Sequence, residues 1–361
     1  VYYREESAAH GVWKRGWHMG FWNTTDIGID LGTSSILVYR KNEGIVLSEP
    51  SLVAVERRTG KLTAIGETAR AMLGRTPPEI AVVRPLQNGV ISDFEATRRL
   101  LGYFFKKVAG ARPLIGPRVV ICIPSGVTEA EKRCVVEAAT AAGARRCYLI
   151  EEPIAAAIGA GIDIAAGRGS MVLDIGGGTT DMAVISFGGI VLSDSIRVAG
   201  DRFDEALIRY IRRKHDLVIG ERSAEDIKIQ YGRAHIGKEQ QIIEIRGRSL
   251  LTGLPESVPV GTNELVDAMA EPLRQIMDRV RTLFEQTPPE LAADITESGV
   301  CLTGGGAQLA GLDRYIADYT GVPCRLADNP VTCVAMGTGR VIENLSVYSG
   351  ALRDYRRREY R

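Results

Sequence analysis

The sequence predicts an α/β protein made of two related halves, and three patterns support this prediction. Short apolar runs that end in turn-forming residues are typical of buried strands, and four of them occur, at 27–31, 119–123, 171–175 and 300–302. Segments with helical periodicity separate these runs. A strand–turn–strand pattern also occurs twice, with its aspartates 144 residues apart, at Asp30 and Asp174 (174 − 30).

The segments between the strands are expected to form amphipathic helices. Residues 93–108 place Phe94, Leu101 and Phe105 on one side of a helix. Thr128 and Glu131 have the spacing of a capping box and predict a helix that runs to about residue 143. We expect a second helix start at 223–226 and a helical segment at 309–320. Strands that alternate with helices indicate sheets covered by helices.

Length and charge limit the possible classes of protein. The 361 residues are enough for two domains of roughly 150–200 residues each. The net charge is +1, from 45 Lys and Arg against 44 Asp and Glu, so the composition indicates no nucleic-acid partner. Six cysteines without a C-x-x-C pair or zinc-ligand spacing favour a reducing cytoplasm. We find no signal peptide and no run of about 18 apolar residues that would span a membrane.

The two repeated turns have the residue types of a phosphate-binding site. Glycine lets backbone N–H groups approach phosphate oxygens, and hydroxyl side chains add donors. The first turn offers Thr33, Ser34 and Ser35, and the second offers Gly176, Gly177, Gly178 and Thr179. Asp30 and Asp174 end the preceding strands, where their carboxylates can hold hydrated Mg²⁺. The pair predicts ATP–Mg²⁺ binding between two hairpins. The first turn alone is more typical of a structural hairpin, and the glycine run of the second turn is the more specific signal.

Two further segments are candidates for the same site. Gly304, Gly305, Gly306 and Ala307 follow a predicted strand and could lie flat against a nucleoside, although such turns are also common as purely structural features. Glu152 precedes Pro153 at the start of an alanine-rich helix. An acidic residue there either interacts with the helix dipole or orients the water that attacks a γ-phosphate.

Taken in order, these elements resemble the actin-type ATPase superfamily, and within it the bacterial MreB/Mbl family. The resemblance extends over residues 26–344. It is strongest in the motifs at 49–51, 74–77, 197–201, 244–248, 252–255 and 287–291. It implies an actin-like, ribonuclease H-like fold of two lobes, each an α/β core with a smaller insertion around a nucleotide cleft.

The resemblance also implies domain limits and site roles. The first lobe would comprise residues 26–160 and 330–345, with an insertion at about 51–84. The second lobe would comprise residues 161–329, with an insertion at about 201–261. An N-terminal extension at 1–25 would precede the lobes, and a basic tail at 346–361 would follow them. Residues 33–35 and 176–179 would form the phosphate loops, although the family usually has Ala-Asn after the threonine. Glu152 would position the hydrolytic water. The adenosine would lie between residues 304–307 and a segment that contains Glu225, Asp226, Ile227 and Lys228.

The function that the resemblance implies is polymerisation into paired filaments, with slow ATP hydrolysis controlling assembly. Such filaments lie on the inner face of the cytoplasmic membrane and guide the cell-wall synthesis machinery. Membrane contact is expected at Leu114 and Ile115, although these two residues could equally belong to the core. It is also expected at the aromatic N-terminal segment. Family members often begin near Met19, so part of this segment lies upstream of their usual start. The aromatic residues are Trp13, Trp17, Phe21 and Trp22.

Two alternative functions and one question about the C-terminal tail stay open at this point. A sugar or small-acid kinase could use the same two hairpins, although no separate motif for a substrate base is present. A chaperone-like ATPase would normally carry a peptide-binding domain after residue 344. The tail after residue 351 could contact anionic lipid, but a solvated end is the expectation.

Overall fold

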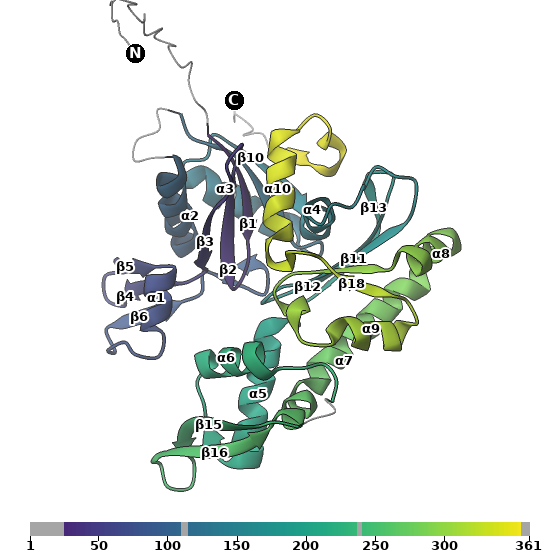
Figure 1. Cartoon of the computed structure of the whole chain (residues 1–361). Helices are drawn as coiled ribbons and strands as arrows, with labels where there is room; N and C mark the ends of the chain where they lie inside the picture. Colours follow the sequence, from purple (N-terminus) through teal and green to yellow (C-terminus); the bar gives the residue numbers. More distant parts are fainter. Residues whose placement is uncertain (1–24, 110–114, 237–239, 355–361) are drawn as a thin grey trace, which may run out of the picture.

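A computed structural model of the chain describes residues 25–109, 115–236 and 240–354. Its first large sheet has the strand order β19-β10-β9-β1-β2-β3 (Figure 1). β1 and β2 form an antiparallel hairpin, and β9 lies parallel to both β1 and β10. The strands are β1 (Asp26–Leu31), β2 (Ser35–Arg40), β3 (Gly44–Pro50), β9 (Arg118–Ile123), β10 (Arg146–Glu151) and β19 (Arg353–Asp354).

The second large sheet repeats this plan. Its order is β13-β12-β11-β17-β18, in which a three-stranded meander is followed by two parallel strands. The strands are β11 (Ser170–Ile175), β12 (Thr180–Ser186), β13 (Gly189–Ile196), β17 (Val300–Thr303) and β18 (Cys324–Leu326). All four strands expected from the apolar runs are present, and the shared topology confirms that the two halves are related.

Helices cover both faces of each sheet because successive strand residues point to opposite sides. In the first sheet, Val119 and Ile121 pack with α2 and α3, whereas Val120 and Cys122 face α4 and α10. In the second, Leu173 packs in a core with α5 and α7, and Val172 faces α4 and α10. The helices are α2 (Phe94–Ala109), α3 (Glu129–Ala141), α4 (Glu152–Gly159), α5 (Gly200–His215), α7 (Thr262–Gln286) and α10 (Cys333–Glu343).

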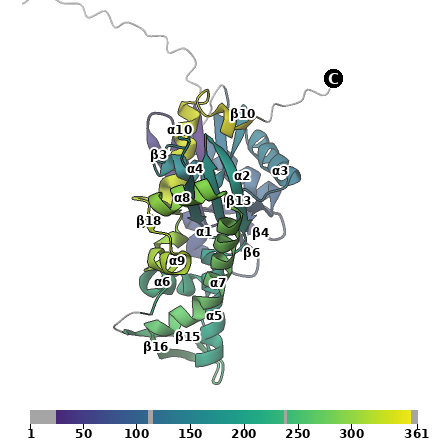
Figure 2. The same ribbon diagram turned by 90° about the vertical axis from the view of Figure 1, so that its right-hand side faces the viewer.

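Two small sheets extend the lobes on either side of the cleft. One consists of β4 (Val53–Glu56), β5 (Leu62–Ile65) and β6 (Ile80–Val83), with α1 (Glu67–Met72) packed on it. The other consists of β14 (Leu217–Val218), β15 (Ile242–Ser249) and β16 (Pro255–Gly261). The β15–β16 hairpin lies at the opposite end of the molecule from β10 (Figures 1 and 2).

The remaining elements are short or lie at the surface of the second lobe. A two-stranded hairpin precedes α2, and three 3₁₀ turns follow β17, β18 and α10. They are β7 (Leu86–Gln87), β8 (Val90–Ile91), η1 (Gly306–Gln308), η2 (Pro330–Thr332) and η3 (Ser349–Ala351). The other helices are α6 (Glu221–Tyr231), α8 (Pro289–Ser298) and α9 (Leu312–Thr320).

Most of the local helix signals are confirmed, including the segment expected at 93–108, which forms α2, and the start at Glu152, which opens α4, but two expected starts are displaced. The Thr128–Glu131 capping box forms, and α3 begins directly after it. The expected start at Ser223 is wrong by two residues: α6 begins at Glu221, directly after the extended N-cap residue Gly220, so Ser223 falls inside the first turn. The helix expected from residue 309 begins only at Leu312, because Gly311 has a left-handed backbone (φ 76°).

The tail differs in part from the expected solvated end. Arg353 and Asp354 pair with β10 as an edge strand, and Leu352 packs against the core between the two sheets. Residues 355–361 lie outside the described part of the chain.

Candidate functional site

The two glycine turns meet across the cleft between the lobes. A Cβ placed on Gly177 would collide with the Ser34 hydroxyl, and one on Gly178 would collide with Thr33 Oγ1. The backbone of the second turn therefore lies directly against the side chains of the first. Glycine is required here because any side chain would push the two turns apart.

A cavity of about 260 Å³ opens beside these turns. The structure brings nearly all of the predicted site residues together around it. From the first lobe these are Asp30, Thr33, Ser34, Ser35 and Glu152, and from the second Asp174, Gly176, Gly177, Gly178, Thr179, Glu225, Lys228, Gly304, Gly305 and Gly306. The geometry thus unites segments that lie up to 276 residues apart in the sequence, from Asp30 to Gly306 (306 − 30).

Three of the predicted residues do not line this cavity. Ala307 is buried in the core of the second lobe. Ile227 packs against the same core, and Asp226 is exposed on α6. On this helix, residues 225, 228 and 229 face the cavity, so consecutive residues of one helical turn cannot all reach it.

The carboxyl groups at the base of the cavity are buried together. Burial raises the pKa of Asp30 to about 6 and that of Asp174 to about 7. The pKa of Glu152 lies well above its ordinary value, because of burial and then of the nearby charges of Asp181, Asp174 and Asp30. The Cys122 thiol donates to Asp30 Oδ1 at 3.4 Å, and the Thr303 hydroxyl donates to Asp174 Oδ1 at 2.6 Å.

This oxygen-rich, negatively charged pocket fits a hard divalent cation such as Mg²⁺. Mg²⁺ prefers oxygen ligands and keeps several waters, so one or two carboxylates are sufficient. Asp30 and Asp174 are the residues that would hold it. In residues 25–109, 115–236 and 240–354 there is no group of three His, Cys, Asp or Glu side chains placed to ligate a metal directly.

Two aspartates in the cleft make contacts that the sequence patterns do not reveal. Ser34 donates to Asp201 Oδ1 at 3.3 Å, and Asp201 lines the cavity from the first turn of α5. Asp181 is buried and accepts from the backbone N–H of Ser125 at 3.0 Å. Both contacts join the two lobes. A motif search has no signal for them, because the partners are 167 and 56 residues apart.

Two exposed aliphatic side chains also line the cavity. Ile229 on α6 and Val331 on η2 line it and are 69% and 40% exposed, respectively. Exposed aliphatic side chains on two walls suit a planar, uncharged ring system. Neither residue stood out in the sequence, since each lies in a short segment without a recognisable motif.

Lys228 lines the cavity, but its ammonium group already has protein partners. Nζ donates to Asp204 Oδ2 at 2.8 Å and to the carbonyl oxygen of Gly200 at 2.9 Å. These contacts fix α6 against the start of α5. Because the ammonium group is occupied, the aliphatic stem of Lys228 is the part best placed to contact a ligand.

The residues expected at a membrane lie mostly outside the described structure. Trp13, Trp17, Phe21, Trp22 and Leu114 are not described, and Ile115 is half-buried. In the part of the chain that the structure describes, no helix has the length and apolar character needed to cross a bilayer.

Two sheets of the same topology around a glycine-lined cleft define an actin-like protein. The chain is similar to the crystal structure of MreB5 of Spiroplasma citri bound to ADP, with a TM-score of 0.86 and 37% sequence identity over 91% of this chain and 98% of that one. It also shares the fold of a MamK double helical filament, with a TM-score of 0.77 and 24% identity over 89% and 99% of the two chains.

The sequence comparisons narrow this class to one family. Residues 24–349 match the MreB/Mbl protein family. The chain is 49% identical to the cell shape-determining protein MreB of Escherichia coli (strain K12) over 336 residues, which cover 91% of this chain and 96% of that protein. It is 48% identical to the cell shape-determining protein Mbl of Bacillus subtilis (strain 168) over 89% and 96% of the two chains. The chain belongs to the MreB/Mbl family.

Proposed function

We propose that this chain is a cell-shape cytoskeletal protein that binds ATP and Mg²⁺ in the cleft and polymerises, with slow hydrolysis controlling assembly. The observation that supports this most strongly is the convergence of two glycine turns and three buried carboxyl groups on one cavity. The crystal structures of MreB5 of Spiroplasma citri bound to ADP and to AMPPNP add support from relatives of the same fold.

The residues that line the cavity suggest how a nucleoside triphosphate would bind. The phosphates would lie at the two glycine turns, where backbone N–H groups and the hydroxyl of Thr33 are available. The base would lie between Ile229 and Val331. Bound Mg²⁺ would neutralise phosphate charge near Asp30 and Asp174.

Glu152 is the residue best placed to assist hydrolysis. Its carboxyl lies at the cavity in the first turn of α4, close to the buried aspartates. Without a cation this environment favours the protonated form, and a positive charge nearby would favour the carboxylate. As a carboxylate, Glu152 would accept a hydrogen bond from a water and orient it toward the terminal phosphate.

Self-association is supported by an apolar tip on the second lobe, which we define as the side chains of Leu250, Leu251 and Leu254 in the β15–β16 turn. They are 41%, 81% and 65% exposed, respectively. Three exposed leucines in one turn are unusual on a free surface and are typical of a protein contact. Since the tip lies at one end of an elongated molecule (Figure 2), a contact there would add subunits end to end.

Association with the inner membrane face and with the cell-wall synthesis machinery is part of the same proposal. It rests on the resemblance and on the family's cell shape-determining relatives. The similarity to these proteins over nine-tenths of the chain also weighs against the kinase and chaperone alternatives.

The deciding experiment is sedimentation of the purified protein with ATP–Mg²⁺, with and without anionic liposomes, combined with electron microscopy of the pellet. Paired filaments are the expected result, with more protein in the pellet when liposomes are present. A monodisperse protein under every nucleotide and lipid condition would contradict the proposal.

A further inference from the structure

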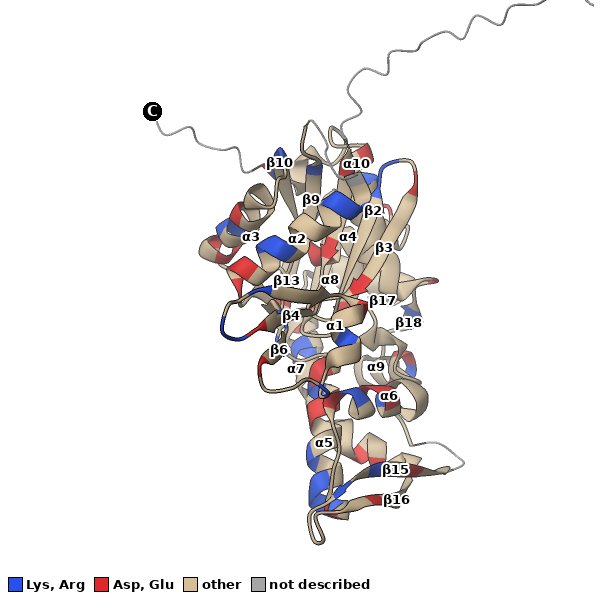
Figure 3. Ribbon diagram, turned by 90° about the vertical axis from the view of Figure 1, so that its left-hand side faces the viewer, with Lys and Arg blue, Asp and Glu red and all other residues tan. Residues whose placement is uncertain are grey.

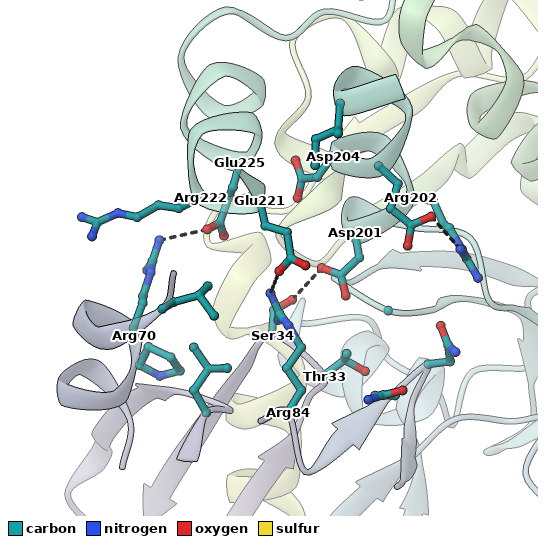
Figure 4. Close-up of a pocket in the computed structure, with 18 residues that line it drawn as sticks. Thr33, Ser34, Arg70, Arg84, Asp201, Arg202, Asp204, Glu221, Arg222 and Glu225 are labelled. Carbon is teal, nitrogen blue, oxygen red and sulfur yellow. Dashed lines mark hydrogen bonds and ion pairs between the residues drawn. The ribbon is translucent and has the colours of Figure 1, made fainter. Parts of the chain in front are cut away.

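A second cavity, of about 380 Å³, lies between the lobes next to the nucleotide cavity (Figure 4). Residues of α1 and of the segments at 50–52 and 84–88 in the first lobe form one wall, and α5 and α6 of the second lobe form the other. Thr33, Ser34, Gly178, Asp201 and Glu225 line both cavities. A change at this outer cavity can therefore act directly on the nucleotide site.

The walls of this cavity carry opposite charges. The second lobe contributes five acidic residues and two basic ones, of which Arg202 is paired with Glu205 of the same lobe, so its wall is acidic on balance; the first lobe faces it with Arg70 and Arg84. The lining residues of the second-lobe wall with charge are Asp201, Arg202, Asp204, Glu205, Glu221, Arg222 and Glu225. Figure 3 shows acidic and basic residues together where α1 approaches α6. Charge complementarity between the two walls favours the closed arrangement of the lobes.

Two ion pairs cross the gap. Arg70 Nη2 lies 3.0 Å from Glu225 Oε2, and Arg84 Nη2 lies 3.8 Å from Glu221 Oε2 (Figure 4). Arg70 is at the end of α1, whereas Glu225 is 155 residues later on α6. Both side chains of this closer pair are about one-third exposed, at 34% and 35%, so solvent can reach the bond.

Glu225 faces a crowded acidic wall from its own lobe. Its charge contributes to raising the pKa of Asp201 and of Asp204, after burial as the larger cause in both cases. The nearby Lys228 is bonded to Asp204 and to the carbonyl of Gly200. The cation that bonds to the Glu225 carboxylate thus comes from the opposite lobe.

We propose that Arg70 is a positioning residue that holds Glu225 for the nucleotide and latches the two lobes together. This inference rests on the proposed nucleotide binding. Arg70 bonds to Oε2, so Oε1 can still accept a hydrogen bond from a ligand hydroxyl in the nucleotide cavity. Because the nucleotide lies between the lobes, its release requires them to separate, and separation breaks the Arg70–Glu225 pair.

The latch has an electrostatic signature that a packing contact lacks. Ion pairs that solvent can reach contribute modestly and are screened by salt. Removing one is expected to speed nucleotide release by about two- to fivefold, the factor that corresponds to the usual strength of such a pair. Added salt should speed release from the unmodified protein but have less effect once the arginine is gone.

The test measures dissociation of a fluorescent ADP analogue, chased with excess ADP, at low and high salt. Arg70→Ala should release the analogue about two- to fivefold faster with a weaker salt dependence, and Arg70→Glu faster still, because it places a carboxylate opposite Glu225. Arg70→Lys keeps the positive charge, so its release rate should lie between those of the unmodified protein and Arg70→Ala. Arg75→Ala is the matched control, since Arg75 is exposed in the same segment and does not line either cavity.

Each outcome separates the latch from the proposed function. If the unmodified protein binds no nucleotide, the proposed function fails. If it binds nucleotide but Arg70→Ala and Arg75→Ala release it at the same rate and with the same salt dependence, the latch is refuted alone. Thermal unfolding of both variants checks that the fold is retained, and faster release without any change in salt dependence would also contradict an ion-pair latch.

Discussion

At the scale of single residues, the cleft is characterised by several carboxyl groups that are buried together. Glu152 has the most strongly perturbed surroundings, since burial and three aspartates all raise its pKa. A structural protein without a ligand at this place would gain stability by replacing such a group with a neutral one. The presence of several buried carboxyl groups in one cavity therefore indicates that they act on a charged ligand.

Replacing Glu152 with Gln tests its role in hydrolysis. The amide keeps the size of the side chain but is a poor acceptor for the attacking water's proton, so the rate of phosphate release should fall by about 10²-fold or more. Nucleotide affinity should change little, because the phosphate loops are untouched. Single-turnover hydrolysis and equilibrium binding of the same variant measure the two quantities.

The contrary result is also clear for this variant. Turnover equal to that of the unmodified protein would assign Glu152 to the helix start alone. Thr128→Ala is a useful control, because it removes the α3 capping box at the surface and should cost about 1 kcal/mol of stability without altering turnover.

At the scale of elements, the two lobes are joined through α4 and α10. These helices cross so closely that a Cβ on Gly337 would collide with the Ala155 carbonyl, and one on Gly159 would collide with the Cys333 carbonyl. The crossing lies in the core shared by both sheets. Since α4 also carries Glu152, the packing of two backbones sets the position of a proposed catalytic group.

Gly337→Ala should therefore destabilise the protein more than an ordinary surface substitution. Overpacking of this kind costs about 1–3 kcal/mol, because the helices must move apart to admit the methyl group. We expect a lower Tm in thermal unfolding and weaker nucleotide binding. Gly350→Ala is the matched control, since a Cβ there meets no atom within 4 Å; equal Tm values for the two variants would refute the close crossing.

The elements show which parts of the structure local sequence patterns can predict. The four buried strands and the Thr128 helix start depend on neighbouring residues, and they were predicted correctly. The start expected at Ser223 was wrong by two residues, because α6 begins after Gly220, an N-cap without a side chain that a capping pattern could reveal. Ala307 was grouped with its glycine neighbours, yet the 3₁₀ turn η1 directs its side chain into the core.

At the scale of the whole molecule, the limits of sequence reasoning are physical. The two-hairpin plan could be predicted because it repeats along the chain. The contacts between lobes could not, since Ser34–Asp201, Ser125–Asp181 and Arg70–Glu225 depend on how two distant segments face each other. These contacts complete the cleft, so the site is a property of the closed molecule as much as of its motifs.

The apolar tip gives the last prediction, which concerns assembly. Burying one exposed leucine contributes about 1.5–3 kcal/mol, and a carboxylate in its place would also have to be desolvated. Leu251→Asp should therefore raise the protein concentration needed for pelleting with ATP–Mg²⁺ by about tenfold or more.

Phe187→Asp is the matched control, because Phe187 is equally exposed at 81% but lies in the β12–β13 turn, where its left-handed backbone (φ 49°) tolerates Asp. Both variants should bind nucleotide as the unmodified protein does. If Leu251→Asp pellets at the same concentration as Phe187→Asp, the tip is not an assembly contact, and the leucines need another partner.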